Sequence, residues 1–265
     1  MILNCQQLLQ IRLYLSQLMT KKIYFASDFH LGSPNHQQSR LREDRMLRWL
    51  NFIEPTCSEL FLMGDVFDFW FEYKMVIPKG YARLQGKLAM MSDAGIKIYF
   101  FKGNHDMWVH DYFTIELGMQ IISDEFEMER NGKKFYLHHG DGLGPGDHKY
   151  KFLRKVFRNP ACQWLFSLVP PRIGIGIANA WSDSSRTKKA HAYTVPEDEW
   201  LFTHATEQLQ KKHYDYFIFG HRHLPLDLKV GSSSRYVNTG EWINYSSYAV
   251  FDGNELALKY FEKEY

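Results

Sequence analysis

The chain has 265 residues, which suits one large domain or two small ones and is ample for a buried core. Hydrophobic residues make up 45% of the sequence and charged residues 23%, an ordinary composition for a globular protein. The net charge of only +2 gives no argument for a nucleic-acid-binding protein, and no apolar run reaches the roughly 20 residues that a membrane span needs.

Residues 1–20 precede the first expected strand and carry no secretory signature. Their apolar positions are interrupted by Gln and Arg, and they lack a basic start and a small-residue cleavage site. We interpret them as an N-terminal extension that forms an amphipathic helix of unknown role. Met19 lies just before the first strand, which leaves an over-long start assignment open.

In the first half, short buried strands alternate with segments of helical periodicity. The expected strands are Ile23–Ala26, Leu60–Met63 and Ile98–Phe101, and the expected helices are Leu41–Ile53 and Tyr81–Ala94, the latter closed by Gly95. This alternation predicts an α/β layer.

The pattern then changes to hairpins and isolated strands. Phe126–Arg130 and Lys133–Leu137 flank Asn131-Gly132, the signature of a type I′ turn. Further strands are expected at Phe217–Phe219, Tyr236–Asn238, Tyr248–Phe251 and Leu256–Phe261. We predict a more antiparallel second half, and for the whole chain an α/β (α+β) fold of two sheets flanked by helices.

Residues 144–206, here called the insertion, interrupt this pattern. A basic helical stretch around Lys149–Arg158 is followed by Pro160 and then by an apolar segment that runs through Trp181. One interpretation is a helical insertion packed on its own core. The other is a lid, because apolar lining with basic residues nearby suits a ligand with an anionic head and acyl chains. Both can hold together.

Five polar motifs stand at the ends of the apolar runs. They are Asp28-x-His30, Gly64-Asp65, Gly103-Asn104-His105-Asp106, His139-Gly140-Asp141 and Gly220-His221-Arg222-His223. Carboxylates, an amide oxygen and several imidazoles are the ligand set of a two-metal hydrolytic site. Ligands bind beyond the carboxyl ends of strands in open α/β sheets, and the first three motifs fall there.

The residue types suggest roles within this set. Asp28 and His30 need a turn to converge, and Gly64 lets the backbone and a metal approach Asp65, our candidate for the bridging carboxylate. Asn104, His139 and His221 are expected on one metal and His223 on the other. Five further histidines lack a partner motif and are assigned to solvent or packing roles: His138, His148, His191, His204 and His213. Phe67–Phe71 is interpreted as wall and core, with Asp68 left outside the predicted site.

The ordered motifs resemble those of the calcineurin-like metallophosphoesterase superfamily from Asp28 to His223. The resemblance implies a metallophosphoesterase β-sandwich of two mixed sheets with flanking helices over residues 21–265, and a dinuclear centre, commonly of manganese. It implies that one metal is held by Asp28, His30, Asp65 and His223, and the other by Asp65, Asn104, His139 and His221. His105 would assist the transition state or leaving group, with Asp106 orienting it, so that His105, Asp106 and Asp65 form the catalytic set.

A narrower resemblance joins the chain to the bacterial UDP-2,3-diacylglucosamine pyrophosphatases of lipid A synthesis. It is carried by Gly64–Asp68, His139–Leu143 and the insertion pattern from Asp147 to Pro170. It implies substrate contacts at Asn104, His105, Asp147, Tyr150 and Ser185. One position departs, because members of that family carry Arg where this chain has His105, the residue of the broader superfamily.

The resemblance implies release of UMP and 2,3-diacylglucosamine 1-phosphate from a UDP-linked diacylated glucosamine, using two divalent ions, most readily Mn²⁺. A phosphodiesterase or phosphatase acting on a soluble nucleotide or other phosphoester is the alternative, and a non-catalytic metal-binding scaffold is the second. Cys5, Cys57 and Cys162 form no metal or disulfide pattern, which favours the reducing cytoplasm. Together these features predict a cytoplasmic enzyme, peripheral at the inner membrane face, without nucleic-acid partners.

Overall fold

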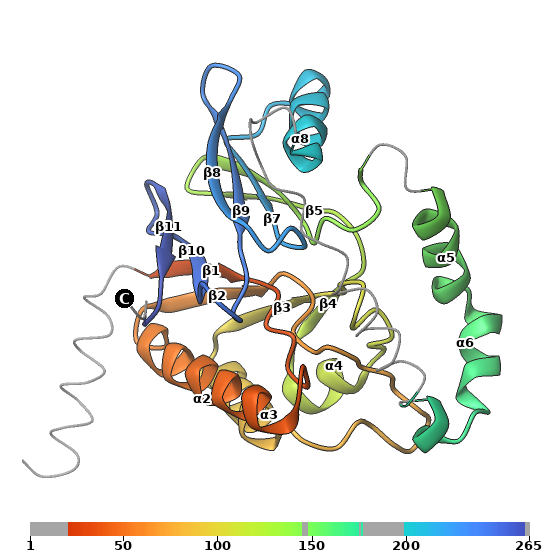
Figure 1. The fold of residues 1–265 in the computed structure, drawn as a ribbon. Coiled ribbons are helices and arrows are strands. Elements are labelled where there is room, and N and C mark those ends of the chain that lie inside the picture. Colours follow the sequence, from red (N-terminus) through yellow and green to blue (C-terminus); the bar gives the residue numbers. More distant parts are fainter. Residues whose placement is uncertain (1–20, 145–147, 175, 177–198, 263–265) are drawn as a thin grey trace, which may run out of the picture.

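Two sheets lie face to face between layers of helices (Figure 1). The computed structural model describes residues 21–144, 148–174, 176 and 199–262. The N-terminal extension, Asp147 and Ser185 lie outside these ranges, so the predictions made for them stay predictions. The mixed two-sheet sandwich with flanking helices is confirmed.

The first sheet has the strand order β11-β10-β1-β2-β3-β4. Its strands are β1 (Lys22–Ala26), β2 (Cys57–Leu62), β3 (Lys97–Phe101), β4 (Gln120–Ile122), β10 (Ser247–Phe251) and β11 (Leu256–Tyr260). The strands β1 to β4 run parallel, whereas β10 pairs antiparallel with β1 and with β11. The last hairpin of the chain therefore completes the sheet that the first strand begins.

The second sheet has the order β5-β6-β7-β9-β8. Its strands are β5 (Phe126–Arg130), β6 (Lys133–His138), β7 (Tyr216–Phe219), β8 (Pro225–Val230) and β9 (Ser234–Thr239). We expected this half to be more antiparallel, but its centre β6-β7-β9 is parallel and only the two edge strands run the other way. The long connection from β6 to β7 passes through the insertion and a helix, which is the kind of crossover that parallel pairing requires.

Alternating side chains explain why both faces of these strands are buried. In β2, Leu60 and Leu62 face the helices, whereas Phe61 faces the second sheet. The helices on the outer side are α2 (His36–Ile53), α3 (Ala82–Asp93) and α4 (Tyr112–Leu117). On the far side, α8 (Trp200–Lys211) covers the second sheet.

Most predicted elements are confirmed with bounds shifted by a few residues. Asn131 and Gly132 both have positive φ, at 51° and 74°, as the expected type I′ turn requires. The elements that the sequence did not reveal are α4, β4 and β8. They are short or lie at a sheet edge, so they carry little hydrophobic periodicity.

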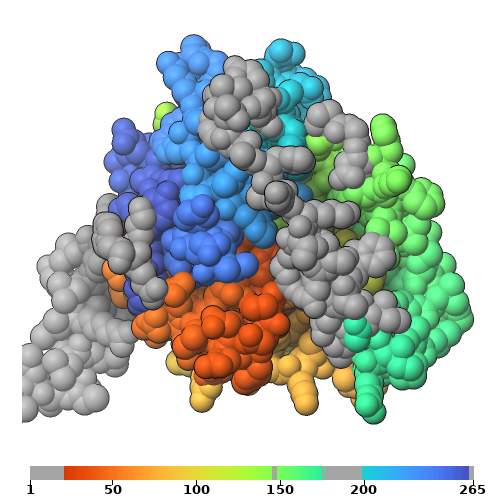
Figure 2. All heavy atoms as spheres, in the orientation of Figure 1, coloured from red at the N-terminus to blue at the C-terminus, as the bar shows by residue number. Residues whose placement is uncertain are grey.

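The described part of the insertion includes the helices α5 (His148–Arg158) and α6 (Pro160–Ser167), which lie along one flank of the molecule (Figure 2). They pack on an aromatic wall, because the Phe166 ring lies 4.9 Å from both Phe71 and Trp108. Several apolar side chains of this segment are exposed: Phe152, Trp164, Leu165, Leu168 and Ile173. The part of the chain that the structure describes contains no helix with the length and apolar character needed to cross a membrane.

The insertion ends earlier than predicted. We placed its end at residue 206, but Leu201 and Ala205 of α8 are fully buried against the second sheet. Their burial makes α8 part of the sandwich, so the insertion ends before Trp200.

Candidate metal centre

All five motifs lie at the carboxyl ends of strands, at one edge of the sandwich. In the first sheet, Ala26 is level with Leu62, and Leu62 is level with Phe100, so the segments after β1, β2 and β3 begin side by side. In the second sheet, His138 is level with Phe219, which brings His139 beside the segment that follows β7. Parallel pairing in each sheet thus gathers residues that are far apart in the sequence.

Five of the predicted ligands have left-handed backbone conformations, in which non-glycine residues are uncommon. The residues are Asp28 (φ 56°), His30 (φ 45°), Asp65 (φ 52°), His221 (φ 66°) and His223 (φ 57°). Backbone hydrogen bonds hold the first loop in place, with Asp28 N–H donating to Gly64 and His30 N–H donating to Asp65, each at 3.0 Å. Such strain concentrates at functional sites, where the surrounding fold imposes it.

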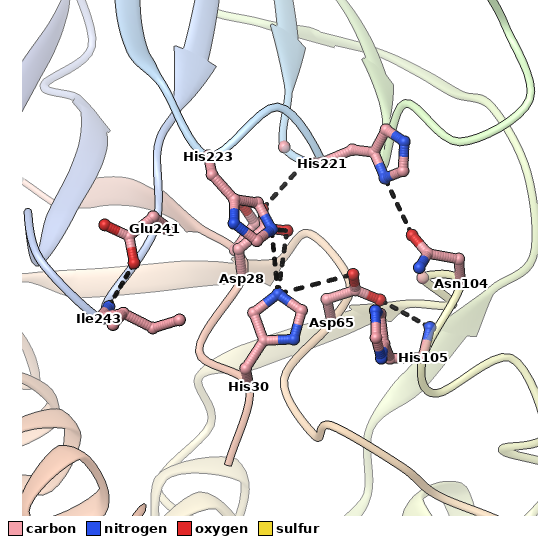
Figure 3. A network of polar contacts seen from close by, with 12 residues as sticks. Asp28, His30, Asp65, Asn104, His105, His221, His223, Glu241 and Ile243 are labelled. Carbon is pink, nitrogen blue, oxygen red and sulfur yellow. Dashed lines mark hydrogen bonds and ion pairs between the residues drawn. The ribbon is translucent and has the colours of Figure 1, made fainter. Parts of the chain in front are cut away.

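The first group of ligands converges from both sheets (Figure 3). It consists of Asp28, His30, Asp65 and His223. The Nε2 atoms of His30 and His223 are 3.1 Å apart, and His223 Nε2 is 3.2 Å from Asp28 Oδ1. His30 Nε2 lies 3.7 Å from Asp28 Oδ1 and 3.8 Å from Asp65 Oδ2. The structure therefore brings together all four residues predicted for one metal.

The second group shares Asp65 with the first. His139 Nε2 lies 3.5 Å from Asp65 Oδ2, and Asn104 Oδ1 lies 3.2 Å from His139 Nε2 and 2.9 Å from His221 Nδ1. His139 Nδ1 is 2.8 Å from the carbonyl oxygen of Met63, so it carries the proton in the neutral ring. Its Nε2 lone pair then faces the Asn104 and Asp65 oxygens.

These donor sets fit divalent ions. Ligands about 2.1 Å from one ion lie about 3 Å apart at right angles and about 3.4 Å apart in a tetrahedron. The separations within each group are close to these values. Electron-rich atoms that face one another also need a cation between them, and Asp28 Oδ1 is buried without a hydrogen-bond partner among the described residues. Asp65 belongs to both groups, as a bridging carboxylate would.

The electrostatics of the site favour cations. Burial by itself would lower the pKa of His30, but hydrogen bonds to Asp28 and Asp68 and the charge of Asp65 raise it to about 10. Burial would likewise lower the pKa of His139, but the charge and hydrogen bond of Asp65 raise it to about 10. In the metal-free protein, the protons on the His30 and His139 rings supply the positive charge that bound metal ions would otherwise supply.

Metal binding is therefore expected to release protons. Because the folded pKa values of His30 and His139 lie above 6.5, their protonated forms stabilise the metal-free protein below pH 6.5, and this contribution is lost as pH rises through 10. A divalent ion must displace both protons, so we expect about two protons released per chain at pH 8 and tighter binding as pH rises. Calorimetry in two buffers of different ionisation enthalpy measures this, and identical heats in both buffers would contradict it.

The contacts of Asp106 differ from the predicted role. Its carboxylate accepts backbone N–H groups of Gly103 (2.8 Å), Val66 (2.8 Å), Phe67 (3.3 Å) and Asp65 (3.3 Å). We expected Asp106 to orient His105, but these bonds join the loops after β2 and β3. Asp106 therefore fixes the backbone on which Asp65 stands.

The contacts of Gly64 are also more specific than expected. We argued that its missing side chain admits a metal. A Cβ at Gly64 would instead come within 2.5 Å of His139 Nδ1, so glycine is needed to admit the ring of His139.

Asp68 is the site residue that the sequence did not reveal. His105 Nδ1 lies 3.0 Å from the backbone oxygen of Asp68, and His30 Nδ1 lies 3.5 Å from its carboxylate. Asp68 therefore orients both rings, as carboxylates behind metal-binding histidines commonly do. The aromatic side chains around it hid the signal, although Phe67 and Phe71 are buried as predicted.

The remaining predictions can be placed only in part. The Tyr150 hydroxyl of α5 donates to Asp141 Oδ2 at 2.9 Å, which sets it beside the segment that carries His139. Of the histidines assigned to packing or solvent, His138 is buried and accepts the N–H of Gly140, whereas His213 is exposed. His191 lies outside the described residues.

Comparison with known proteins gives consistent matches. A family model described as calcineurin-like phosphoesterase matches residues 21–225. UDP-2,3-diacylglucosamine hydrolase of Porphyromonas gingivalis is 40% identical over 259 residues, covering 92% of this chain and 99% of that protein. The protein of the same name from Edwardsiella ictaluri is 29% identical over 239 residues, covering 88% and 90% respectively. Among solved structures, Yfce, a phosphoesterase from E. coli, aligns over 91% of this chain and 93% of its own, with 18% identity and a TM-score of 0.45.

Proposed function

The chain belongs to the calcineurin-like phosphoesterase family, and from this premise we propose that it hydrolyses UDP-2,3-diacylglucosamine to UMP and 2,3-diacylglucosamine 1-phosphate, a step of lipid A biosynthesis. As a member, the chain is a metal-dependent phosphoesterase. One observation carries the choice of substrate: the 40% identity to the Porphyromonas gingivalis hydrolase extends over nearly all of both chains.

The insertion supports a substrate with acyl chains. Its described helices expose apolar side chains such as Trp164 and Leu165, while α5 carries basic residues that include Lys155 and Arg158. Arg154 of the same helix lies 2.7 Å from Asp141, two residues beyond His139. An acylated molecule that carries a diphosphate matches this combination of apolar surface and positive charge close to a metal centre.

The two ligand groups would hold two divalent ions, for which we propose Mn²⁺. Such ions polarise phosphoryl oxygens and lower the pKa of water. Hydrolysis adds water to one phosphorus atom and breaks its bond to the bridging oxygen, which leaves with the other product. His105 lies beside His30, with ring centroids 4.8 Å apart, and is placed to exchange a proton with a phosphoryl or leaving-group oxygen.

For substrate binding we propose contacts from Asn104, His105 and Tyr150, together with Asp147 and Ser185. We further propose that the enzyme works in the cytoplasm at the inner face of the membrane, where a diacylated substrate resides. The apolar side chains of the insertion would contact the acyl chains.

Product analysis tests this function. With Mn²⁺ added to the full chain, we expect UMP release from UDP-2,3-diacylglucosamine and far slower release from UDP-N-acetylglucosamine, which lacks the acyl chains. The comparison is read by separating uridine products chromatographically. Good turnover of the soluble nucleotide together with inactivity on the acylated one would overturn the proposal. That result would favour a phosphodiesterase or phosphatase acting on soluble substrates, the alternative supported by His105, which is the residue of the broader superfamily at this position.

A substitution in the insertion separates acyl recognition from stability. Leu165→Ser changes a side chain that is 57% exposed, so we expect KM for the acylated substrate to rise about 10-fold, since an exposed leucine that binds acyl chains contributes about 1.5 kcal/mol. Turnover of a small chromogenic phosphodiester should stay unchanged. Leu41→Ser, at 56% exposure on α2, is the matched control and should leave both activities intact. Equal losses on both substrates would contradict acyl recognition by Leu165.

A further inference from the structure

Helix α5 is attached to the sandwich mainly through polar contacts, beside one aromatic contact in which the Phe157 ring lies 5.3 Å from that of Trp108. None of its side chains is fully buried. Arg154 Nη2 lies 3.1 Å from Asp124 Oδ1, and Arg158 Nη1 lies 2.5 Å from the same oxygen. Figure 1 shows α5 standing beside the sheets, and Figure 2 shows it on the flank of the molecule. Polar attachment of this kind allows a helix to shift at lower cost than a buried apolar interface does.

Two further contacts of α5, both to the carboxylate of Asp141, lie close to the metal centre. Asp141, only 1% exposed, stands two residues after His139 and accepts the Tyr150 hydroxyl at 2.9 Å. The Nε atom of Arg154 lies 2.7 Å from the same carboxylate oxygen. A single buried carboxylate therefore links two side chains of α5 to the segment that carries a metal ligand.

The two α5 side chains compensate the charge of the buried Asp141 carboxylate. Movement of α5 would remove Tyr150 and Arg154 from Asp141 and leave a buried carboxylate without compensation, which is strongly unfavourable. The position of α5 is thus connected to the segment that carries His139.

Glu199, the residue that precedes α8, makes a comparable contact with Arg222, which lies beside the ligand His221. Glu199, fully buried at the start of α8, accepts Arg222 Nε with both oxygens at 3.0 and 2.9 Å. Arg222 stands between His221 and His223. Both segments that border the insertion are therefore tied by buried carboxylates to the loops that supply imidazole ligands.

We propose that Asp141 is a positioning residue that couples the placement of α5 to metal binding at Asp65, Asn104, His139 and His221. By reciprocity, a ligand that shifts α5 changes the metal affinity of this group, and bound metal favours one placement of α5. The inference needs the metal centre but not the acylated substrate, so it goes beyond the proposed function.

A double-mutant cycle on the full, chelator-stripped chain tests the coupling, with Mn²⁺ affinity measured by calorimetry. Tyr150→Phe removes one hydrogen bond to Asp141, and we expect affinity at the weaker-binding group to fall about 5-fold. Asp141→Ala should lower it about 10-fold. The double variant should match Asp141→Ala, because the two side chains act through one contact.

Control variants separate coupling from simple attachment of the helix. Asp124→Asn weakens the ion pairs of Arg154 and Arg158 but leaves both contacts to Asp141 in place, so Mn²⁺ affinity should fall less than in Tyr150→Phe. If Asp141→Ala does not fold, Arg154→Gln replaces it, with an expected 5-fold loss that Arg154→Lys restores. Wild-type affinity in Tyr150→Phe, independent losses that multiply in the double variant, or an equal loss in Asp124→Asn would overturn the proposal. UMP release plays no part in these readouts, so a failure of the proposed substrate is seen separately.

Discussion

Asp65→Asn is expected to abolish turnover, with kcat falling about 10³-fold or more, which corresponds to about 4 kcal/mol of transition-state stabilisation. Asp65 is the residue shared by the two candidate ligand groups, so its charge would serve both ions. Asparagine keeps the shape of the side chain. Its oxygen can still accept the backbone N–H of His105, which donates to Asp65 Oδ1 at 2.9 Å. The loss should therefore come from charge and not from collapse of the loop.

Metal content and activity are measured together for this variant. We expect fewer than two Mn²⁺ ions per chain by elemental analysis and an unchanged thermal transition of the metal-free protein within a few degrees. Asp93→Asn, an exposed carboxylate at the end of α3, is the control and should behave as the unaltered chain does. A variant that keeps full activity would remove Asp65 from the bridging position.

His105→Ala is expected to lower kcat about 10²-fold or more, the usual contribution of a positioned proton-transfer group. Metal content should persist, because His105 belongs to neither of the two predicted ligand groups. Burial lowers the pKa of His105, and the charges of Asp65 and Asp68 oppose that shift, so the neutral form of the ring is favoured relative to a free imidazole. Its Nδ1 proton faces Asp68, which leaves Nε2 to meet the substrate.

Two further substitutions sharpen this test. His105→Arg introduces the residue that the resembled lipid A enzymes carry, and partial recovery over His105→Ala would show that positive charge or hydrogen bonding is what the position supplies. His213→Ala, an exposed histidine, should leave kcat unchanged. Unchanged turnover in His105→Ala would contradict the role given to this ring.

The strands and the convergence of the candidate metal ligands could be predicted for the same physical reason. Buried parallel strands are short apolar runs, and the residues after them must turn away from the sheet, so polar motifs at those points are visible in the sequence. Asp28, Asn104 and His221 were placed in the candidate site in this way. The short β4 and the edge strand β8 were not, because half-exposed strands lack such runs.

The residues that hold the candidate ligands and their loops in place could not be predicted from the sequence. Asp68 lies in an aromatic run that indicates packing, and its contact with His30 depends on a fold that bends the loop back. Asp106 looked like a partner of His105 because it is adjacent, yet its oxygens bind backbone N–H groups 40 residues away. The pairing of Arg222 with Glu199 likewise spans 23 residues and carries no motif.

The measurement that tests the metal centre most directly is anomalous diffraction at the manganese absorption edge from crystals grown with Mn²⁺. We expect two peaks about 3.5–4 Å apart. One should lie among Asp28, His30, Asp65 and His223, and the other among Asp65, Asn104, His139 and His221. A single peak, or a peak held by His30, Asp68 and His105 in place of these, would contradict the two-metal centre.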